Sequence, residues 1–176
     1  LHAELMLRVA AKEKAGAMTL EDALKFAAQF RESIGIVPTD VTQSDGSGLS
    51  RNGLVTPQSV VGVLSYADRQ SWGEAFAATL PVAGEDGTLE NRMKNTAAAG
   101  RVHSNTGTVN SAAGLSGYAT TLNGQRLIFS FFGNNNSGTA RDSTTVLDAM
   151  CVAMVEELGA AVVSLGTDAS PEPAHE

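Results

Sequence analysis

The chain has 176 residues, of which 43% are hydrophobic and 5% aromatic, as in an ordinary single globular domain. Its formal net charge of −7 argues against nucleic acid as a partner, because phosphate binding depends on clustered Lys and Arg. No run approaches the ~20 apolar residues of a membrane-spanning helix. The single cysteine, Cys151, excludes an internal disulfide and is expected to be a buried hydrophobe. His2, His103 and His175 lack metal-ligand spacing, so no metal or cofactor is expected, and we expect His103 to be a solvated strand residue.

The first part of the chain predicts two helices. Ala3 to Lys14 places apolar and charged residues at helical spacing, and Gly16 closes the segment. Thr19 to Asp22 has the pattern of a capping box, so a second helix is expected to begin there and to end at Gly35.

A polar loop is expected from Thr39 to Gly53, because this stretch is rich in Gly, Ser and Asp. Such loops on a rigid scaffold often carry function. Thr56-Pro57 then predicts the start of another helix, where proline's missing N–H costs no hydrogen bond. A short helix is expected between Ser71 and Pro81.

The region from Val102 to Phe132 predicts a sheet. Asn123-Gly124 lies between two runs rich in β-branched and aromatic residues, which predicts a hairpin with a type I′ turn. Val102 to Val109 is expected to add a third strand. Leu127 to Phe132 is apolar without alternation, which predicts a strand covered on both faces and flanked by neighbours.

The last predicted helix begins at Asp142 or Ser143 and ends at Gly159. Its buried face is expected to contain the apolar residues that recur at helical spacing, Val146, Ala149, Met150, Ala153 and Met154. A short strand or docking segment is expected to follow at 160–165. Residues 167–176 predict a disordered tail after a domain of residues 1–166.

Several short motifs follow one another along the chain. They are Asp45-Gly-Ser-Gly-Leu-Ser-Arg-Asn52, Thr56-Pro57, Leu80-Pro-Val-Ala-Gly84, Asp86-Gly-Thr-Leu89, Arg92, Thr106-Gly-Thr108 and Leu115-Ser-Gly-Tyr118. A Ser-x-Asn loop followed by a strand with x-Thr-Gly-Thr matches two of the three motifs of penicillin-recognising serine enzymes. The order and spacing resemble the low-molecular-mass class C penicillin-binding proteins, the D-alanyl-D-alanine carboxypeptidase/endopeptidases of bacteria, over most of the chain.

The resemblance implies an α/β (α+β) fold of the penicillin-binding and β-lactamase type, an antiparallel sheet flanked by helices. The first motif of that family, a Ser-x-x-Lys nucleophile, does not occur in the sequence. We therefore expect the C-terminal portion of a transpeptidase-like domain, incomplete at its N-terminus, whose partner is the missing part of the same domain. An apolar sheet edge left open would favour aggregation.

By resemblance, Ser50 would relay a proton to the leaving amine and Asn52 would bind the substrate's amide. Thr106 and Thr108 would receive the substrate's terminal carboxylate, and the Thr108 N–H would complete the oxyanion hole. Gly107 would let a peptide approach the strand closely. Taken alone, Ser50 and Asn52 are more often turn residues than catalysts.

Asn105 stands where the family has lysine, and we include it among the substrate-binding residues. Replacing a charge-assisted hydrogen bond by a neutral one loses about 1–2 kcal/mol, hence roughly ten-fold in binding. Arg51, Arg101 or His103 are candidates to replace that charge. Arg92, Asp45 and Asp86 are expected to be structural.

The leading hypothesis is a serine-type D-Ala-D-Ala carboxypeptidase/endopeptidase that forms an acyl-enzyme with peptidoglycan stem peptides and binds β-lactams in the periplasm or another extracytoplasmic compartment. This chain alone is not expected to be active. An alternative is a catalytically impaired penicillin-binding-fold protein that binds cell-wall peptides or partner proteins. A β-lactamase or esterase comes third, because residues 80–92 are more like those of the carboxypeptidases.

Overall fold

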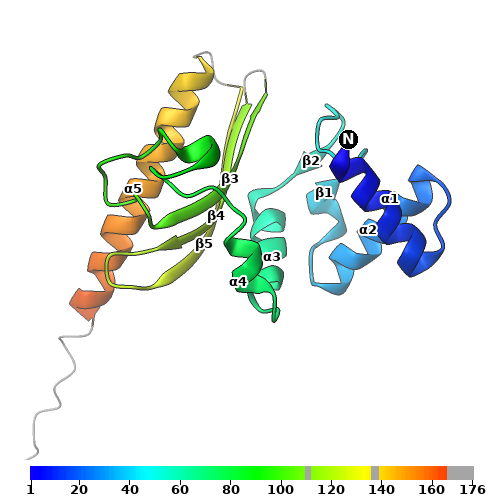
Figure 1. Cartoon of the computed structure of the whole chain (residues 1–176), viewed down its shortest axis with the longest axis horizontal. Coiled ribbons are helices and arrows are strands. Elements are labelled where there is room, and N and C mark those ends of the chain that lie inside the picture. The colour runs from blue at the N-terminus through cyan, green and yellow to red at the C-terminus, as the bar shows by residue number, and fades with distance from the viewer. Residues whose placement is uncertain (110–111, 136–138, 166–176) are drawn as a thin grey trace, which may run out of the picture. The chain divides into compact units, whose positions relative to one another are not determined.

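The computed structural model describes residues 1–109, 112–135 and 139–165 (Figure 1). The tail expected at residues 167–176 lies outside these residues. The chain forms two compact units, Leu1–Gln70 and Ser71–Glu176, and each is described by itself. Within the described ranges, no helix combines the length and the apolar character that a membrane span requires.

The first unit begins with the two predicted helices, α1 (His2–Ala15) and α2 (Leu20–Ser33). Gly16 ends α1 in the left-handed conformation, with φ of 66°, and its N–H bonds to the carbonyl of Lys12. Thr19 caps α2, because its hydroxyl accepts a hydrogen bond from the Asp22 N–H at 3.1 Å. The capping signals in the sequence are therefore confirmed.

A two-stranded sheet precedes the third helix of this unit. A single helical turn, η1 (Pro38–Asp40), leads into β1 (Val41–Thr42), which pairs antiparallel with β2 (Leu54–Val55). The predicted loop therefore starts after Thr42 rather than at Thr39, because the β-branched residues Val41 and Thr42 pair with β2. Helix α3 (Pro57–Asp68) follows, with Thr56 as its cap as predicted.

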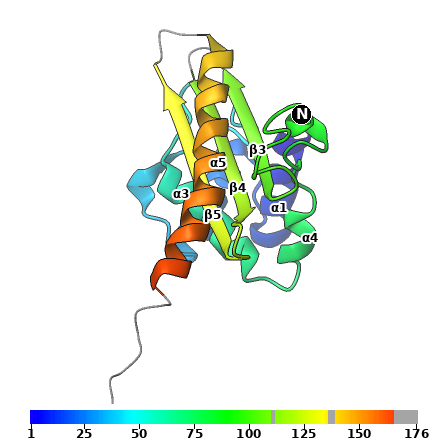
Figure 2. The same cartoon turned by 90° about the vertical axis from the view of Figure 1, so that its left-hand side faces the viewer.

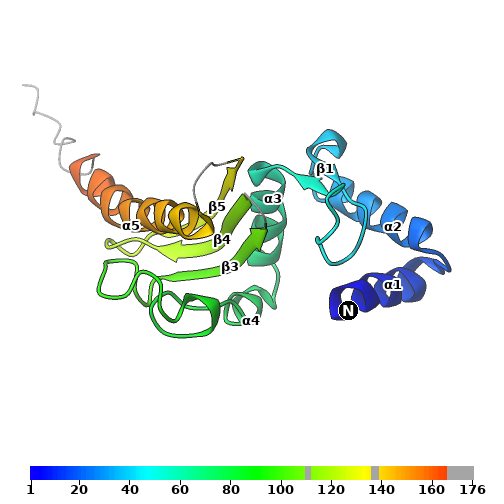
Figure 3. The ribbon, with the colours of Figure 1, turned by 90° about the horizontal axis from the view of Figure 1, so that it is seen from above.

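The second unit contains one helix packed on a sheet. After α4 (Gly73–Ala77) and the turn η2 (Gly87–Leu89), the strands β3 (Val102–Val109), β4 (Ala112–Thr120) and β5 (Arg126–Asn134) form an antiparallel sheet in that order. Helix α5 (Ala140–Leu165) crosses one face of this sheet (Figures 2 and 3). The core between them contains Val102, Leu115, Ala119, Phe129, Leu147, Cys151 and Val155.

The hairpin at Asn123-Gly124 is confirmed, but the predicted turn type is wrong. Gly124 has a positive φ of 86°, whereas Asn123 does not. The Gly124 N–H bonds to the Thr121 carbonyl, and the Thr121 N–H bonds to the Gln125 carbonyl, both at 2.9 Å. This is the three-residue loop in which a turn is followed by one left-handed residue, so only one of the two positions needs glycine.

Strand β5 lies at the edge of the sheet, where the sequence predicts a second neighbour that the described part of this chain does not supply. Within the described residues it pairs with β4 alone. Of its side chains, Phe129 is buried and most of the others are half-buried. The second unit thus presents β5 as an edge strand with apolar side chains.

Helix α5 is longer than predicted and buries a different face. It begins after Thr139, whose hydroxyl accepts a hydrogen bond from the Asp142 N–H, and it continues through Gly159, so the segment 160–165 is helical. The buried residues are Leu147, Cys151 and Val155, whereas the predicted face is exposed at its first members, with Val146 at 59%. Apolar residues are adjacent at Val146–Leu147 and at Met150–Cys151, so the helix has two apolar stripes about 100° apart around its axis. The sheet covers only the stripe that contains Leu147 and Cys151.

Two structural expectations hold in this core. Cys151 is fully buried, and burial raises the pKa of its thiol to about 12, so the thiol stays protonated. Arg92 fixes its loop by pairing with Asp148 of α5, with Nη2 2.6 Å from Oδ1 and Nε 3.0 Å from the same oxygen.

Gly117 provides a test of this packing, because a Cβ at this position would lie 2.0 Å from the His103 carbonyl oxygen and 2.7 Å from the Ser104 Cα. Relieving such a clash requires β3 and β4 to separate. We expect Gly117→Ala to lower the free energy of unfolding by about 3 kcal/mol or more, measured by urea titration. Gly133→Ala is the control, since a Cβ there has nothing within 4 Å. Equal stability of the two variants would contradict the register.

Candidate functional site

The outer edge of β3 is free over the predicted substrate-binding motif. At its start, β3 is bridged by the segment before η2, through Ser104 N–H to the Pro81 carbonyl and Ala83 N–H to the Val102 carbonyl, both at 2.9 Å. Even-numbered residues of β3 therefore direct their backbone groups away from β4. Thr106 and Thr108 follow this alternation, and no described residue bonds their N–H groups. The motif thus exposes two outward N–H groups.

The side chains of the motif alternate between the two faces of the sheet. Asn105 is exposed and lies opposite Ser116, which lies opposite Ser130, and the two serine hydroxyls bond at 2.8 Å. Thr106 lies opposite the core residue Leu115, on the face that α5 covers. An extended ligand along the edge would therefore meet Asn105 on one side and the threonines on the other.

Thr88 is a contact that the sequence did not reveal. The Thr106 hydroxyl donates a hydrogen bond to the Thr88 hydroxyl at 3.0 Å. This contact fixes the rotamer of the motif threonine from a segment eighteen residues away in the sequence. Gly107 lies between Thr106 and Thr108 and leaves the strand open, since a Cβ at this position would have no atom within 4 Å.

Asp45 organises the loop that carries Ser50 and Asn52. Its carboxylate accepts hydrogen bonds from the N–H groups of Gly48 at 2.7 Å and of Ser50 at 2.8 Å. These bonds, with the Gly48 N–H as the main cause, lower the pKa of Asp45. The expectation that Asp45 is structural agrees with these contacts.

The same loop is tied to α1. Glu4 accepts hydrogen bonds through Oε1 from Gly46 N–H at 2.9 Å and Ser47 N–H at 3.0 Å. The loop backbone approaches the helix so closely that a Cβ at Gly46 would lie 2.8 Å from the Ala3 carbonyl oxygen. Glycine is therefore required at this point.

Ser50 and Asn52 make the contacts of turn residues. The Ser50 hydroxyl accepts a hydrogen bond from the Asn52 N–H at 3.2 Å, and Asn52 is exposed. These two residues belong to the first unit, whereas the Asn105-to-Thr108 motif belongs to the second. Their catalytic roles stay predictions.

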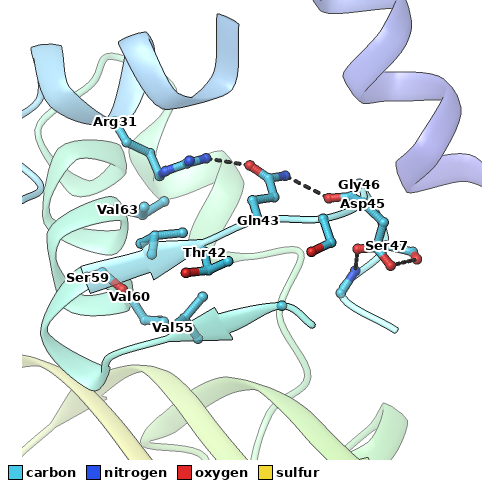
Figure 4. Close-up of a pocket in the computed structure, with 14 residues that line it drawn as sticks. Arg31, Thr42, Gln43, Asp45, Gly46, Ser47, Val55, Ser59, Val60 and Val63 are labelled. Atoms are coloured by element: carbon cyan, nitrogen blue, oxygen red, sulfur yellow. Dashed lines mark hydrogen bonds between the residues drawn. The ribbon is translucent and has the colours of Figure 1, made fainter. Parts of the chain in front are cut away.

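A pocket of about 420 Å³ lies beside this loop (Figure 4). Arg31 donates to the Gln43 side-chain oxygen, and the Gln43 amide donates to the Asp45 carbonyl at 2.9 Å. Val60 and Val63 of α3 form part of its apolar wall. Neither Ser50 nor Asn52 is among its lining residues, so the pocket does not reach these two side chains.

His103 differs from the expectation of a solvated strand residue. Its Nδ1 atom is buried and has no hydrogen-bond partner in the described part of the chain. His103 as a whole is half-buried, and it pairs with Val82 in a bridge that strand alternation does not reveal. The described residues contain no group of three or more His, Cys, Asp and Glu placed to hold a metal ion.

Acidification tests the role of Asp45. Because the folded state lowers the pKa of this carboxyl, its hydrogen bonds are complete above the ordinary pKa of about 3.9 and are lost as the pH falls through the lower folded value. We expect the amide NMR signals of Gly48 and Ser50 to shift together in that acidic range. In Asp45→Asn this transition disappears. A midpoint at or above the ordinary value would contradict the assignment.

Comparison with known proteins confirms the family that the sequence resembles. The D-Ala-D-Ala carboxypeptidase 3 (S13) family matches residues 1–156. The D-alanyl-D-alanine carboxypeptidase of Actinomadura sp. (strain R39) is 39% identical over 163 residues, which cover 90% of this chain and 30% of that protein. Penicillin-sensitive carboxypeptidase A of Dictyostelium discoideum is 30% identical over 165 residues, covering 89% of this chain and 31% of that protein.

Solved structures show the same fold. Penicillin binding protein 4 (dacB) from Haemophilus influenzae superposes with a TM-score of 0.72 at 22% identity, covering 85% of this chain and 36% of that one. The Bd0816 predatory endopeptidase from Bdellovibrio bacteriovorus gives 0.63 at 20% identity, covering 76% and 36%. The chain spans about a third of the length of the relatives that it matches. Its fold is that of the penicillin-binding proteins, and the chain belongs to the D-Ala-D-Ala carboxypeptidase 3 (S13) family.

Proposed function

We propose that this chain supplies the substrate-binding strand of a serine-type D-Ala-D-Ala carboxypeptidase/endopeptidase acting on peptidoglycan stem peptides outside the cytoplasm. The observation that carries the proposal is the free edge of β3, with outward N–H groups at Thr106 and Thr108 on either side of Gly107. An extended peptide can add to such an edge as a further strand. Residues 1–166 would belong to one transpeptidase-like domain.

In this mechanism the peptide lies along β3 with its scissile carbonyl at the Thr108 N–H. A serine oxygen attacks that carbonyl, and the negative charge on the carbonyl oxygen is stabilised by this N–H. The C–N bond then breaks, the leaving amine takes the proton that the serine hydroxyl gave up on attack, and water later hydrolyses the acyl-enzyme. Thr106 and Thr108 receive the terminal carboxylate. Since no Ser-x-x-Lys occurs in the sequence, the proposal assigns the nucleophile to a part of the protein outside these 176 residues.

The proposed roles of Ser50 and Asn52, as proton relay and as ligand of the substrate amide, rest on the resemblance alone. Their observed contacts serve the loop, and no described basic side chain bonds the Ser50 hydroxyl. The free edge of β3 does not depend on these two residues, because it follows from the strand register.

Asn105 favours a second candidate function, a catalytically impaired penicillin-binding-fold protein that binds cell-wall peptides or partner proteins. Its amide is exposed on the sheet face that carries Ser116, and it brings no charge to the edge. A neutral donor can still hold a carboxylate, with a weaker hydrogen bond than lysine would make.

Acylation by a penicillin separates the two functions. The protein is expressed together with any coding sequence that precedes Leu1, incubated with benzylpenicillin and analysed by intact mass spectrometry. The enzyme hypothesis predicts a stoichiometric adduct that maps to a serine before Leu1, and Asn105→Lys is expected to raise the acylation rate about ten-fold. Asn110→Lys is the control, because it adds the same charge to the chain beyond the motif. A folded protein that stays unmodified would contradict the enzyme hypothesis and favour the binding role.

A further inference from the structure

Thr88 lies where the free edge of β3 begins. The neighbouring segment pairs with the start of β3 as far as Pro81, whose carbonyl accepts the Ser104 N–H at 2.9 Å. The chain then turns back in η2, where Gly87 has a positive φ of 52° and a Cβ would lie only 3.1 Å from the Pro81 Cγ. Thr88 follows, and its hydroxyl lies 3.0 Å from that of Thr106. The packed turn of Pro81 and Gly87 therefore closes one end of the free edge and places a hydroxyl there.

The hydrogen bond between the two threonines leaves the proton of Thr88 available. Each threonine hydroxyl has one proton to donate and can accept more than one hydrogen bond. The Thr106 hydroxyl donates its proton to Thr88, whereas the Thr88 hydroxyl donates to no group in the described part of the chain. Thr88 is also exposed, and Thr106 is half-buried. The Thr88 hydroxyl is therefore the better placed of the two to donate to a ligand at the edge.

The proposed direction of the peptide brings its C-terminus to this end of the edge. With the scissile carbonyl at Thr108 and the terminal carboxylate at Thr106, the peptide runs antiparallel to β3 and ends toward Pro81. It cannot continue as a strand there, because the segment of Pro81 already bonds the outer edge at Ser104. A carboxylate at the Thr106 N–H thus stops beside the turn that carries Thr88.

We propose that Thr88 is a further substrate-binding residue, whose hydroxyl donates to one oxygen of the terminal carboxylate while the Thr106 N–H binds the other. The Thr106 hydroxyl, which donates to Thr88, then orients the Thr88 proton toward the ligand. The site selects peptides that end in a free carboxylate one residue after the scissile bond, because a C-terminal amide turns its own donor, the NH2 group, toward one of these two donors. This inference rests on the proposed function and assigns a further ligand of the same site.

Non-covalent binding to the full chain tests this assignment without the nucleophile. Acetyl-D-Ala-D-Ala and its C-terminal amide are titrated at constant pH while the backbone amide signals of Thr106 and Thr108 are recorded by NMR. We expect the acid to bind about ten-fold more tightly than the amide in the unmodified protein. Thr88→Val should remove this preference with both backbone signals still shifting, and Thr88→Ser should keep it. Thr79→Val is the control, because it removes an exposed hydroxyl of the same unit that bonds the Phe76 carbonyl.

Thr106→Val separates the roles of the two threonines. It removes the Thr106 hydroxyl and keeps both its N–H and the Thr88 hydroxyl, so most of the preference for the acid should remain. Urea unfolding of each variant checks that it is folded. Equal affinities of acid and amide in the unmodified protein, a preference that survives in Thr88→Val, or its loss in Thr106→Val alone would overturn this inference and leave the proposed function standing. If neither peptide shifts the Thr106 and Thr108 signals of the unmodified protein, the proposed function is contradicted and the assignment of Thr88 falls with it.

Discussion

The candidate site depends on where the hydrogen-bonded pairing of β3 stops. On one side, β4 pairs with the whole length of β3. On the other side, pairing ends at Pro81, which accepts the Ser104 N–H but has no N–H with which to bond the Ser104 carbonyl. Beyond this proline, no strand among the described residues pairs with the outward N–H and C=O groups of Thr106 and Thr108. A sheet edge is normally a liability, and here it is short and placed at the motif.

The core between α5 and the sheet holds this edge in position. Helix α5 packs on Val102, Leu115 and Phe129, and the Arg92–Asp148 pair ties the segment after η2 to that helix. Thr88, at the same turn, bonds the Thr106 hydroxyl. The threonine that is proposed to meet the substrate carboxylate is thus oriented by the same segment that α5 fixes.

Local signals in the sequence predicted most elements of the fold, because capping residues, proline at a helix start and Asn-Gly between strands act over a few residues. The turn type was wrong because Asn-Gly fits two loop geometries. The face of α5 was wrong because Val146 and Leu147, like Met150 and Cys151, are adjacent apolar residues, and only contact with the sheet decides between the stripes. The apolar composition of β5 predicts a second neighbour outside this sequence, and among the described residues β5 pairs with β4 alone.

The strand that contains Asn105 to Thr108 was predicted from the sequence, and no described residue pairs with its outer edge at Thr106 and Thr108. The substrate-binding role of these residues stays a prediction. Two contacts join residues far apart in the sequence, so no spacing rule indicates them. They are the hydrogen bond between Thr106 and Thr88 and the hydrogen bond between Arg31 and Gln43. The bridge between Val82 and His103 likewise joins two segments far apart in the sequence.

The most direct measurement is amide hydrogen exchange along β3, with and without acetyl-D-Ala-D-Ala. Asn105 and Gly107 direct their N–H groups toward β4, so their amides should exchange slowly in both states. Thr106 and Thr108 should exchange fast in the free protein and slow down when the peptide is bound. Four equally protected amides in the free protein, or no change at Thr106 and Thr108 under saturating peptide, would contradict the account of β3 as a substrate-binding edge.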